Sequence, residues 1–241
     1  QIVNRLYVNG TEQPAGIYSA TQLPTSIQGG GTIEVVAAEE LVVKDSVWDG
    51  GAAPDAGFST AQNWVGDQTP NFVNGFANLV FASGGTNGIF SGLIRVYGLV
   101  FLSGTEFTIQ GETFALGSGG ICFATDSVRS ATNRVLAEIG FTQPLILAVT
   151  NAQSAKPVLE LGRLNDGGNG IAVSLAATNA WYVFRGSNTF GNLTVPPGVI
   201  LSAFAPEPFG GGSGSVTVNA GGWVELYDTK IATKDSIVIQ G

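Results

Sequence analysis

Apolar and polar residues alternate along most of the chain in short segments, which is the pattern of half-buried β-strands. After residue 76, segments with apolar residues two positions apart recur, so that both side chains face the same side of a strand. The clearest of these segments are 107–109, 114–116, 121–123, 159–161, 171–173, 216–218, 224–226 and 237–239. The 3.6-residue spacing of an amphipathic helix is hardly sustained in this region. The pattern therefore predicts an all-β chain.

Turns rich in glycine and proline separate these strands, at 117–120, 167–170, 196–198 and 220–222. Short strands with frequent corners suit either a sandwich or a solenoid of stacked coils. The strand–corner–strand shape of residues 192–201 returns at an offset of roughly 23 residues, close to one turn of a parallel β-helix. We therefore predict a parallel β-helix (β-solenoid), with roughly seven coils in residues 79–241.

Composition removes most chemistries from consideration. Of 241 residues, 35 are glycine and 12% are charged, with no histidine, no methionine and one cysteine, Cys122. Without histidine there is no Ser-His-Asp or Cys-His nucleophile system, and one cysteine forms neither an internal disulfide nor a thiolate metal cage. The net charge of −8 and the pI near 4.4 have the wrong sign for a nucleic-acid binder. No apolar stretch approaches the roughly 20 residues of a membrane span.

Three blocks of the sequence resemble the autotransporter-associated β-strand repeat and the passenger regions that carry it. Residues 187–201 read Ser-Asn-Thr-Phe-Gly, then a strand, a glycine and a second strand, as that repeat does. Residues 48–70, with two tryptophans, are similar to the block that opens such regions, and residues 6–18 and 27–35 are similar to the block that closes them. The resemblance implies a secreted or surface-displayed bacterial protein with a right-handed parallel β-helix, whose role is structural or adhesive.

The blocks stand in reversed order, because the closing block precedes the opening block. Either the chain is one period of a tandem array, or its first strands complete the last coil of a neighbouring copy. The absence of methionine likewise indicates a processed product or an excerpt of a longer chain. We predict terminal strands over 1–36, a linker and opening block over 37–78 with an irregular loop-rich cap around 45–78, and solenoid coils over 79–241.

Both ends of the chain are expected to take part in head-to-tail assembly into an extracellular filament or matrix fibre. An open-ended solenoid exposes unpaired backbone and apolar coil surface, which is a template for another copy. The predicted assembly residues are Ile2, Val3, Leu6, Tyr7, Val8, Ile237, Val238 and Ile239. Copies of the chain are the expected partners, and no cofactor, metal, nucleic acid or membrane span is predicted.

Two other functions stay open at this stage. A surface adhesin that binds glycans or cells needs the same long, weakly charged rod. Trp48 and Trp64 offer either a sugar-stacking platform or, as we favour, a plug for the end of the solenoid core. A polysaccharide lyase or hydrolase can also be built on a β-helix, with acidic residues and an Arg or Lys base. Its candidate residues are Glu106, Glu112, Asp126, Glu138, Glu160, Asp166 and Arg163. None of them forms a clear acid–base pair in the sequence, so we predict no enzyme.

Weaker signals are more simply explained as turns, solvated groups or filling side chains. Residues 166–170, Asp-Gly-Gly-Asn-Gly, approach the calcium-binding nonapeptide, but the motif occurs once and has Ala172 in place of its aspartate. Asp45, Asp49 and Asp55 offer oxygen ligands for calcium, yet loop carboxylates of an acidic protein are usually solvated. Cys122 is expected to fill a strand position.

Overall fold

The computed structural model describes residues 2–3, 6–35, 42–82, 87–92, 94–102, 106–125, 131–151, 156–210, 214–227 and 236–240. The chain divides into two compact units, Gln1–Lys44 and Asp45–Gly241. Within the described ranges there is no α-helix, and a single 3-10 turn, η2, covers Ala61–Asn63. The all-β class predicted from the alternation of apolar and polar residues is confirmed.

The first unit contains a small mixed sheet and a hairpin. In the sheet, β1 runs parallel to β5 and β4 runs antiparallel to it. The hairpin turns at Asn9 and Gly10, which both have positive φ (51° and 79°). The strands are β1 (Ile2–Val3), β2 (Tyr7–Val8), β3 (Thr11–Glu12), β4 (Gly16–Ser19) and β5 (Thr32–Val35). Each of these strands pairs with another strand of the same unit.

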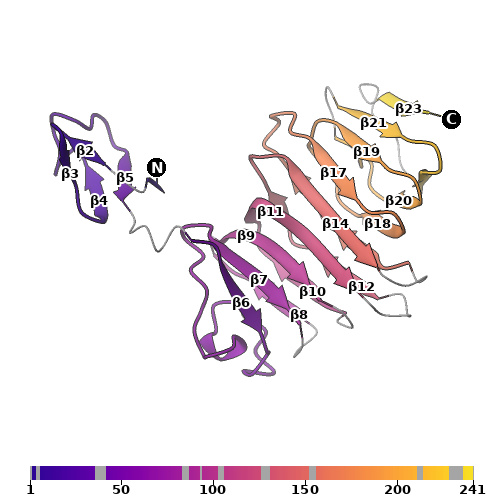
Figure 1. Cartoon of the computed structure of the whole chain (residues 1–241), viewed down its shortest axis with the longest axis horizontal. Helices are drawn as coiled ribbons and strands as arrows, with labels where there is room; N and C mark the ends of the chain where they lie inside the picture. Colours follow the sequence, from indigo (N-terminus) through magenta and orange to yellow (C-terminus); the bar gives the residue numbers. More distant parts are fainter. Residues whose placement is uncertain are drawn as a thin grey trace. The chain divides into compact units, whose positions relative to one another are not determined.

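The second unit is a β-solenoid of about six turns, close to the number predicted (Figure 1). One sheet has seven strands, β8 (Asn87–Phe90), β10 (Thr108–Gly111), β12 (Thr132–Val135), β15 (Val158–Leu161), β18 (Ala180–Phe184), β20 (Val199–Ala203) and β22 (Trp223–Leu226). The other sheet is longer and begins with β6 (Lys44–Trp48), β7 (Ala77–Phe81), β9 (Ile94–Phe101), β11 (Phe114–Thr125) and β14 (Leu145–Asn151). It continues with β17 (Val173–Ala176), β19 (Leu193–Val195), β21 (Ser215–Val218) and β23 (Ser236–Ile239), while β13 (Ile139–Gly140) and β16 (Leu164–Asn165) pair beside its main path.

Strands from successive coils lie side by side and run parallel. The sequence separation of paired residues ranges from 19, for Ala180 beside Val199, to 28, for Leu145 beside Val173. The coils therefore scatter around the predicted offset of roughly 23 residues. This parallel register places equivalent positions of successive coils in columns, both inside and outside the solenoid.

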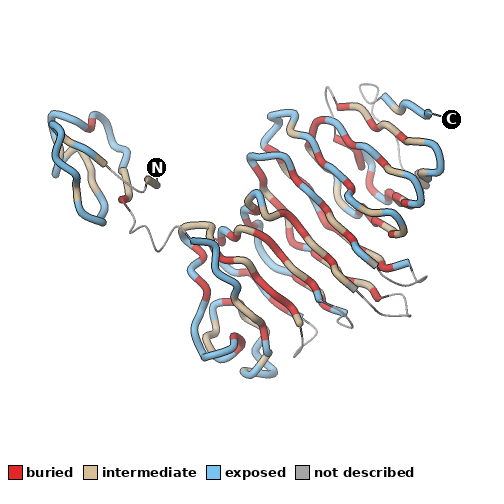
Figure 2. The backbone as a smooth tube through the Cα atoms, viewed as in Figure 1, coloured by how far each residue is buried: buried red, intermediate tan, exposed pale blue. Residues whose placement is uncertain are grey.

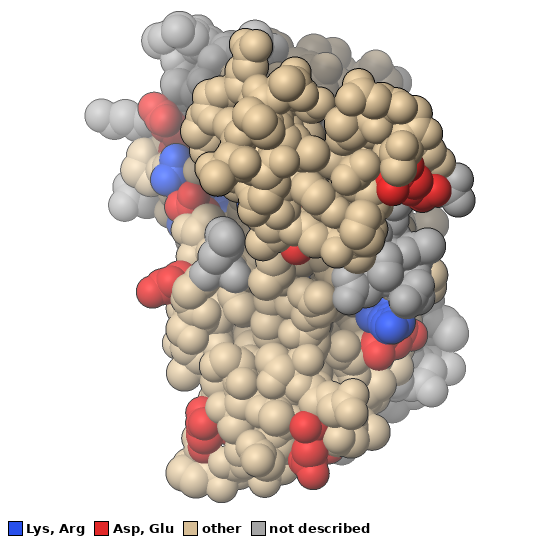
Figure 3. Space-filling view, turned by 90° about the vertical axis from the view of Figure 1, so that its left-hand side faces the viewer, with Lys and Arg blue, Asp and Glu red and all other residues tan. Residues whose placement is uncertain are grey.

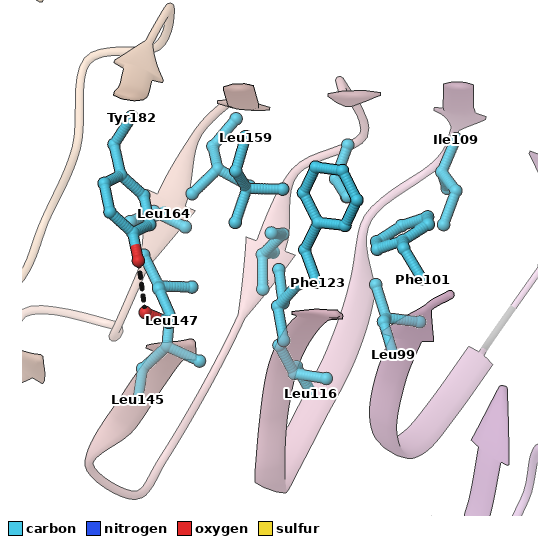
Figure 4. Close-up of a cluster of buried hydrophobic side chains, with 14 of the residues drawn as sticks. Leu99, Phe101, Ile109, Leu116, Phe123, Leu145, Leu147, Leu159, Leu164 and Tyr182 are labelled. Carbon is cyan, nitrogen blue, oxygen red and sulfur yellow. Dashed lines mark hydrogen bonds between the residues drawn. The ribbon is translucent and has the colours of Figure 1, made fainter. Parts of the chain in front are cut away.

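Inward side chains of the two sheets meet in one continuous apolar core (Figures 2 and 4). Equivalent rings stack from coil to coil, as Phe81 does on Phe101 with ring centroids 5.1 Å apart. Tyr182 reaches across the core, and its hydroxyl donates a hydrogen bond to the carbonyl oxygen of Leu147 at 2.7 Å (Figure 4). Each coil buries its apolar face against its neighbours, which is how a solenoid gains stability along its axis.

Buried asparagines connect one coil to the next, Asn188 from a corner and Asn133 from within β12. Asn188 is 1% exposed, and its Oδ1 accepts a hydrogen bond from the backbone N–H of Leu164 at 2.7 Å. Its Nδ2 donates to the carbonyl oxygen of Pro208 at 2.6 Å. Asn133 is also fully buried and accepts a hydrogen bond from the backbone N–H of Phe107 at 2.8 Å. Such amides satisfy backbone groups that the strand ladders leave unpaired at a corner.

A loop-rich segment, residues 49–76, closes the end of the core beside β6. Trp48, Phe58 and Trp64 are at most 1% exposed, and the Trp48 ring lies edge-on 5.0 Å from Phe58 and 5.2 Å from Trp64. The buried Asn63 side chain fixes the loop through hydrogen bonds to its backbone. The plug interpretation of the two tryptophans is therefore confirmed, because neither indole exposes a face on which a sugar could stack.

One predicted corner is wrong. The glycine run 117–120 is expected to separate two strands, but β11 continues through it with a register shift. These glycines make room for Tyr97, since a Cβ on Gly119 would lie 2.5 Å from that ring. The run is an irregularity inside a long strand, as glycine often marks where another group approaches closely.

Candidate functional site

Outward side chains of the seven-stranded sheet line up in columns over the last coils. Successive side chains of a strand point to opposite faces, so every second residue of β15, β18, β20 and β22 lies outside the core. The register places Val158, Trp181, Ile200 and Trp223 in one column, and Glu160, Val183, Ser202 and Glu225 in the next. The outer face of these coils thus combines aromatic, aliphatic and acidic groups in a fixed arrangement.

A chain of hydrogen bonds orients the Glu225 carboxylate. The indole N–H of Trp181 donates to the Ser202 hydroxyl at 2.7 Å, and that hydroxyl donates to Oε2 of Glu225 at 2.6 Å. The Tyr227 hydroxyl donates to the same carboxylate oxygen at 3.0 Å. This bond to Glu225 raises the pKa of the Tyr227 hydroxyl. Both donors bind Oε2, so two hydrogen bonds fix this oxygen of the Glu225 carboxylate.

Stacked groups extend this arrangement across further coils. The rings of Phe204 and Tyr227 are nearly parallel, at 2°, with centroids 4.5 Å apart, and the Arg185 guanidinium lies 4.3 Å from the Phe204 ring centroid. Nε of Arg185 lies 2.7 Å from Oε1 of Glu160, and Nε of Arg134 lies 3.2 Å from its Oε2. Exposed ion pairs contribute little to stability individually, but a connected set limits side-chain motion.

A shallow hollow of about 190 Å³ lies beside Trp223. Its lining includes Ile200, Glu225 and Lys156, together with the glycine corners at 198 and 221. Trp223 is 62% exposed, although tryptophan is usually largely buried. The lining of the hollow therefore combines an exposed indole with a carboxylate and an ammonium group. Sequence reasoning missed this site. The one available signal is the spacing of Trp181 and Trp223, which is about two coils and so places both residues in the same column.

The end of the last coil contains the C-terminal members of the predicted assembly set, Ile237, Val238 and Ile239. They lie in β23, which ends the longer sheet and pairs with β21 on one side. Val238 is 45% exposed and Ile239 is 77% exposed. The neighbouring β22 ends the seven-stranded sheet. The last described coil thus presents a strand edge together with exposed apolar side chains.

The N-terminal members of that set lie in the first unit. They are Ile2, Val3, Leu6, Tyr7 and Val8. The side chain of Ile2 lies outside the described residues, and Val3, Leu6 and Val8 are half-buried. Tyr7 is exposed and donates a hydrogen bond to Oε2 of Glu12 at 3.2 Å. The sheet edges of this unit are β1 and β4.

The residues considered for a lyase or hydrolase are engaged mainly in structural contacts. Oε2 of Glu138 lies 3.3 Å from Nη1 of Arg163, and Glu160 lies between two arginines. Asp166 is 1% exposed, and its carboxylate accepts backbone N–H bonds from Gly168 and Ile171 at 2.8 and 2.7 Å. The remaining candidates are Glu106, Glu112 and Asp126, of which the last lies outside the described residues. Asp166 therefore holds a corner together, in line with the simpler interpretation of residues 166–170.

The loop aspartates considered for calcium also have structural partners. Asp45 accepts a hydrogen bond from Nδ2 of Asn78 at 2.8 Å, and Asp49 accepts one from the backbone N–H of Gly51 at 3.1 Å. Hydrogen bonds from Thr60 and the Gly57 backbone lower the pKa of the Asp55 carboxyl. Over the described ranges, no group of three or more Asp, Glu and Cys side chains is arranged to hold a metal ion.

No family model matches the chain, and neither does any curated protein or solved structure. The resemblance to the autotransporter-associated repeat therefore stays a prediction. Among the described residues no helix is long and apolar enough to cross a bilayer. Figure 3 shows acidic and basic side chains scattered among uncharged ones on the face in view.

Proposed function

We propose that this chain is a structural subunit of a secreted or cell-surface filament, in which copies join head to tail. The supporting observation is that the two ends of the solenoid are unlike. One end is covered by the cap that contains Trp48 and Trp64, whereas the other presents β22 and β23 with exposed apolar side chains. An uncovered end that receives a segment of the next copy gives a contact that repeats from copy to copy and grows into a fibre, while the capped end takes no part in it.

In the proposed contact, the first unit of one copy adds to the open edge of the last coil of the next copy. Its sheet edges, β1 and β4, carry backbone groups that suit strand addition beside β23. Ile17 on β4 is 62% exposed and is matched in chemistry by Ile239, which is 77% exposed. In such a contact, backbone hydrogen bonds provide affinity and the apolar side chains fix the register. A location outside the cell is supported by the sequence resemblance of residues 187–201 and 48–70.

The test uses the full chain at a series of concentrations, with sedimentation velocity and negative-stain microscopy as readouts. We expect filaments that lengthen with concentration. Ile239→Lys places a charge in the proposed contact and should shorten or abolish them. Val65→Lys is the matched control, because Val65 is 61% exposed but lies in the cap, and it should assemble as the unmodified chain does.

Removal of residues 1–36 provides a second test of the same contact. The truncated chain should stay monomeric, with far-UV circular dichroism showing that its β-structure is kept. The proposal is wrong if the unmodified chain is monomeric at every concentration, or if the truncated chain and Ile239→Lys polymerise normally.

A further inference from the structure

We infer that the hollow beside Trp223 binds one sugar unit of a neutral glycan. This inference does not depend on filament assembly, because Trp223 and Glu225 lie on the outer face of β22, whereas the proposed contact adds a strand beside β23. Three properties of the hollow support this inference: an exposed aromatic side chain, a hydrogen-bond acceptor and a donor in its lining, and glycine corners beside the indole.

The aromatic face belongs to Trp223, which is 62% exposed. In the same column, Ile200 and Trp181 extend the apolar surface toward the earlier coils. A pyranose ring has a face of C–H groups that packs on an indole, and a rim of hydroxyl groups that stays available for hydrogen bonds. An exposed tryptophan therefore suits a ligand that is apolar on one face and polar around its edge.

The hydrogen-bonding groups are the Glu225 carboxylate and the Lys156 ammonium group, which both line the hollow. Ser202 and Tyr227 already hold Glu225 through its Oε2. A fixed carboxylate loses little conformational freedom when a ligand hydroxyl donates to it. The site thus combines an acceptor for hydroxyl protons with a donor to hydroxyl oxygens, and a sugar hydroxyl can serve as either partner.

Two glycine corners, at 198 and 221, form part of the lining of the hollow. Gly198 has a φ of 77°, and a Cβ at this position would lie 2.1 Å from the carbonyl oxygen of Thr178. With Gly221 at the next corner, the surface beside Trp223 stays low and open. A hollow of about 190 Å³ is smaller than the roughly 300–1,000 Å³ of most small-molecule pockets. It suits a single ring of a longer glycan whose other units continue along the surface.

Charge selects a neutral glycan over an acidic one. The formal charges of Glu225 and Lys156 cancel within the hollow, while the whole chain carries a net charge of −8. That charge repels polyuronates and sulfated glycans at long range. The chemical class assigned to the site is therefore a neutral hexose oligosaccharide.

The test measures binding of cellohexaose, maltohexaose and mannohexaose, with a galacturonic acid hexamer as the acidic comparison. Calorimetry gives the affinity, and changes in tryptophan fluorescence report on the outward indoles of Trp181 and Trp223, because Trp48 and Trp64 are buried in the core. We expect at least one neutral hexamer to bind and to change the fluorescence. Trp223→Ala should weaken binding at least about tenfold, Trp223→Phe should weaken it less, and Glu225→Gln should weaken it about threefold or more.

Ile146→Ala is the matched control, because Ile146 is 46% exposed on β14 of the other sheet, and its affinity should equal that of the unmodified chain. The inference is overturned if no neutral hexamer binds, if the acidic hexamer binds best, or if Trp223→Ala binds as tightly as the unmodified chain. A Trp223→Ala variant that associates less with itself while it binds glycan unchanged would also overturn it, and would assign Trp223 to a contact between copies. Far-UV circular dichroism of each variant separates loss of binding from loss of fold.

Discussion

Replacement of Asn188 by leucine should destabilise the solenoid far more than the loss of one side chain usually does. Asn188 is 1% exposed, accepts a hydrogen bond from the Leu164 N–H at 2.7 Å and donates one to the Pro208 carbonyl oxygen at 2.6 Å. Leucine keeps the volume but leaves both backbone groups buried without this partner. Each unsatisfied group costs about 1–3 kcal/mol. With some local relaxation, the expected loss in free energy of unfolding is about 2–4 kcal/mol.

Equilibrium unfolding in urea measures this loss, with circular dichroism and tryptophan fluorescence as independent probes. Small proteins have m-values of about 1–3 kcal/mol per molar urea, so the midpoint should fall by about 1 M or more. Hydrogen exchange gives a local readout, because the Leu164 amide should exchange faster in the variant. Asn87→Leu is the matched control: Asn87 is exposed on β8, and its substitution should change stability by less than about 0.5 kcal/mol.

Asn188→Asp separates the two hydrogen bonds through its dependence on pH. The new carboxyl still accepts from the Leu164 N–H, but when ionised it has no proton to donate to the Pro208 carbonyl oxygen. Its folded-state pKa should therefore lie above the value of about 3.9 in the unfolded chain. The variant should be most stable below about pH 4 and lose stability as the pH rises through the folded-state pKa. A pH-independent difference, or an Asn188→Leu variant within about 1 kcal/mol of the unmodified chain, would refute the reasoning.

Three further predictions follow from single contacts. Tyr182→Phe removes the hydroxyl that donates to the Leu147 carbonyl oxygen across the core and should lower the free energy of unfolding by about 1 kcal/mol in urea titrations; an unchanged midpoint would contradict this. Gly198→Ala forces a Cβ to within 2.1 Å of the Thr178 carbonyl oxygen at a φ of 77°. The variant should lose about 1–3 kcal/mol of free energy of unfolding and therefore melt at a lower temperature. An equal or higher thermal midpoint would count against this prediction. Burial raises the pKa of the Cys122 thiol, so iodoacetamide should modify the folded chain at pH 8 more slowly than the urea-unfolded chain, with a rate that increases toward higher pH; equal rates would argue that the thiol is freely exposed.

The strands and the core could be predicted because alternation reports burial directly. Segment 159–161 becomes most of β15, and segment 216–218 becomes most of β21, each with alternate residues buried. The glycine run 117–120 could not be predicted in the same way. Glycine occurs both at corners and at strand positions where another group approaches closely, so the residue type alone does not distinguish them. Only the register, which brings Tyr97 beside Gly119, distinguishes the two.

The candidate sugar site was beyond sequence reasoning for a related reason. Trp48, Trp64 and Trp223 all stand near glycines in the sequence, yet the first two are buried in the cap and the third is exposed. Which face a strand residue occupies depends on its coil, and a shift of one residue exchanges the faces. The contact of Glu225 with Ser202 joins residues 23 positions apart. Such a contact becomes predictable only once the length of that coil is known.

Assembly and glycan binding are proposed for different surfaces of one fold, and the fold itself makes this separation possible. The core residues of each coil set stability through contacts with the coils on either side, so outward positions are free to carry a binding function. Trp223 and Ile239 illustrate this freedom, because both are more than 60% exposed and lie in different sheets. Substitutions at sites that share no partners usually have additive effects. A chain with both substitutions should therefore lose glycan affinity by the same factor as Trp223→Ala alone and polymer length by the same factor as Ile239→Lys alone. Strong coupling between the two losses would show that one surface serves both functions.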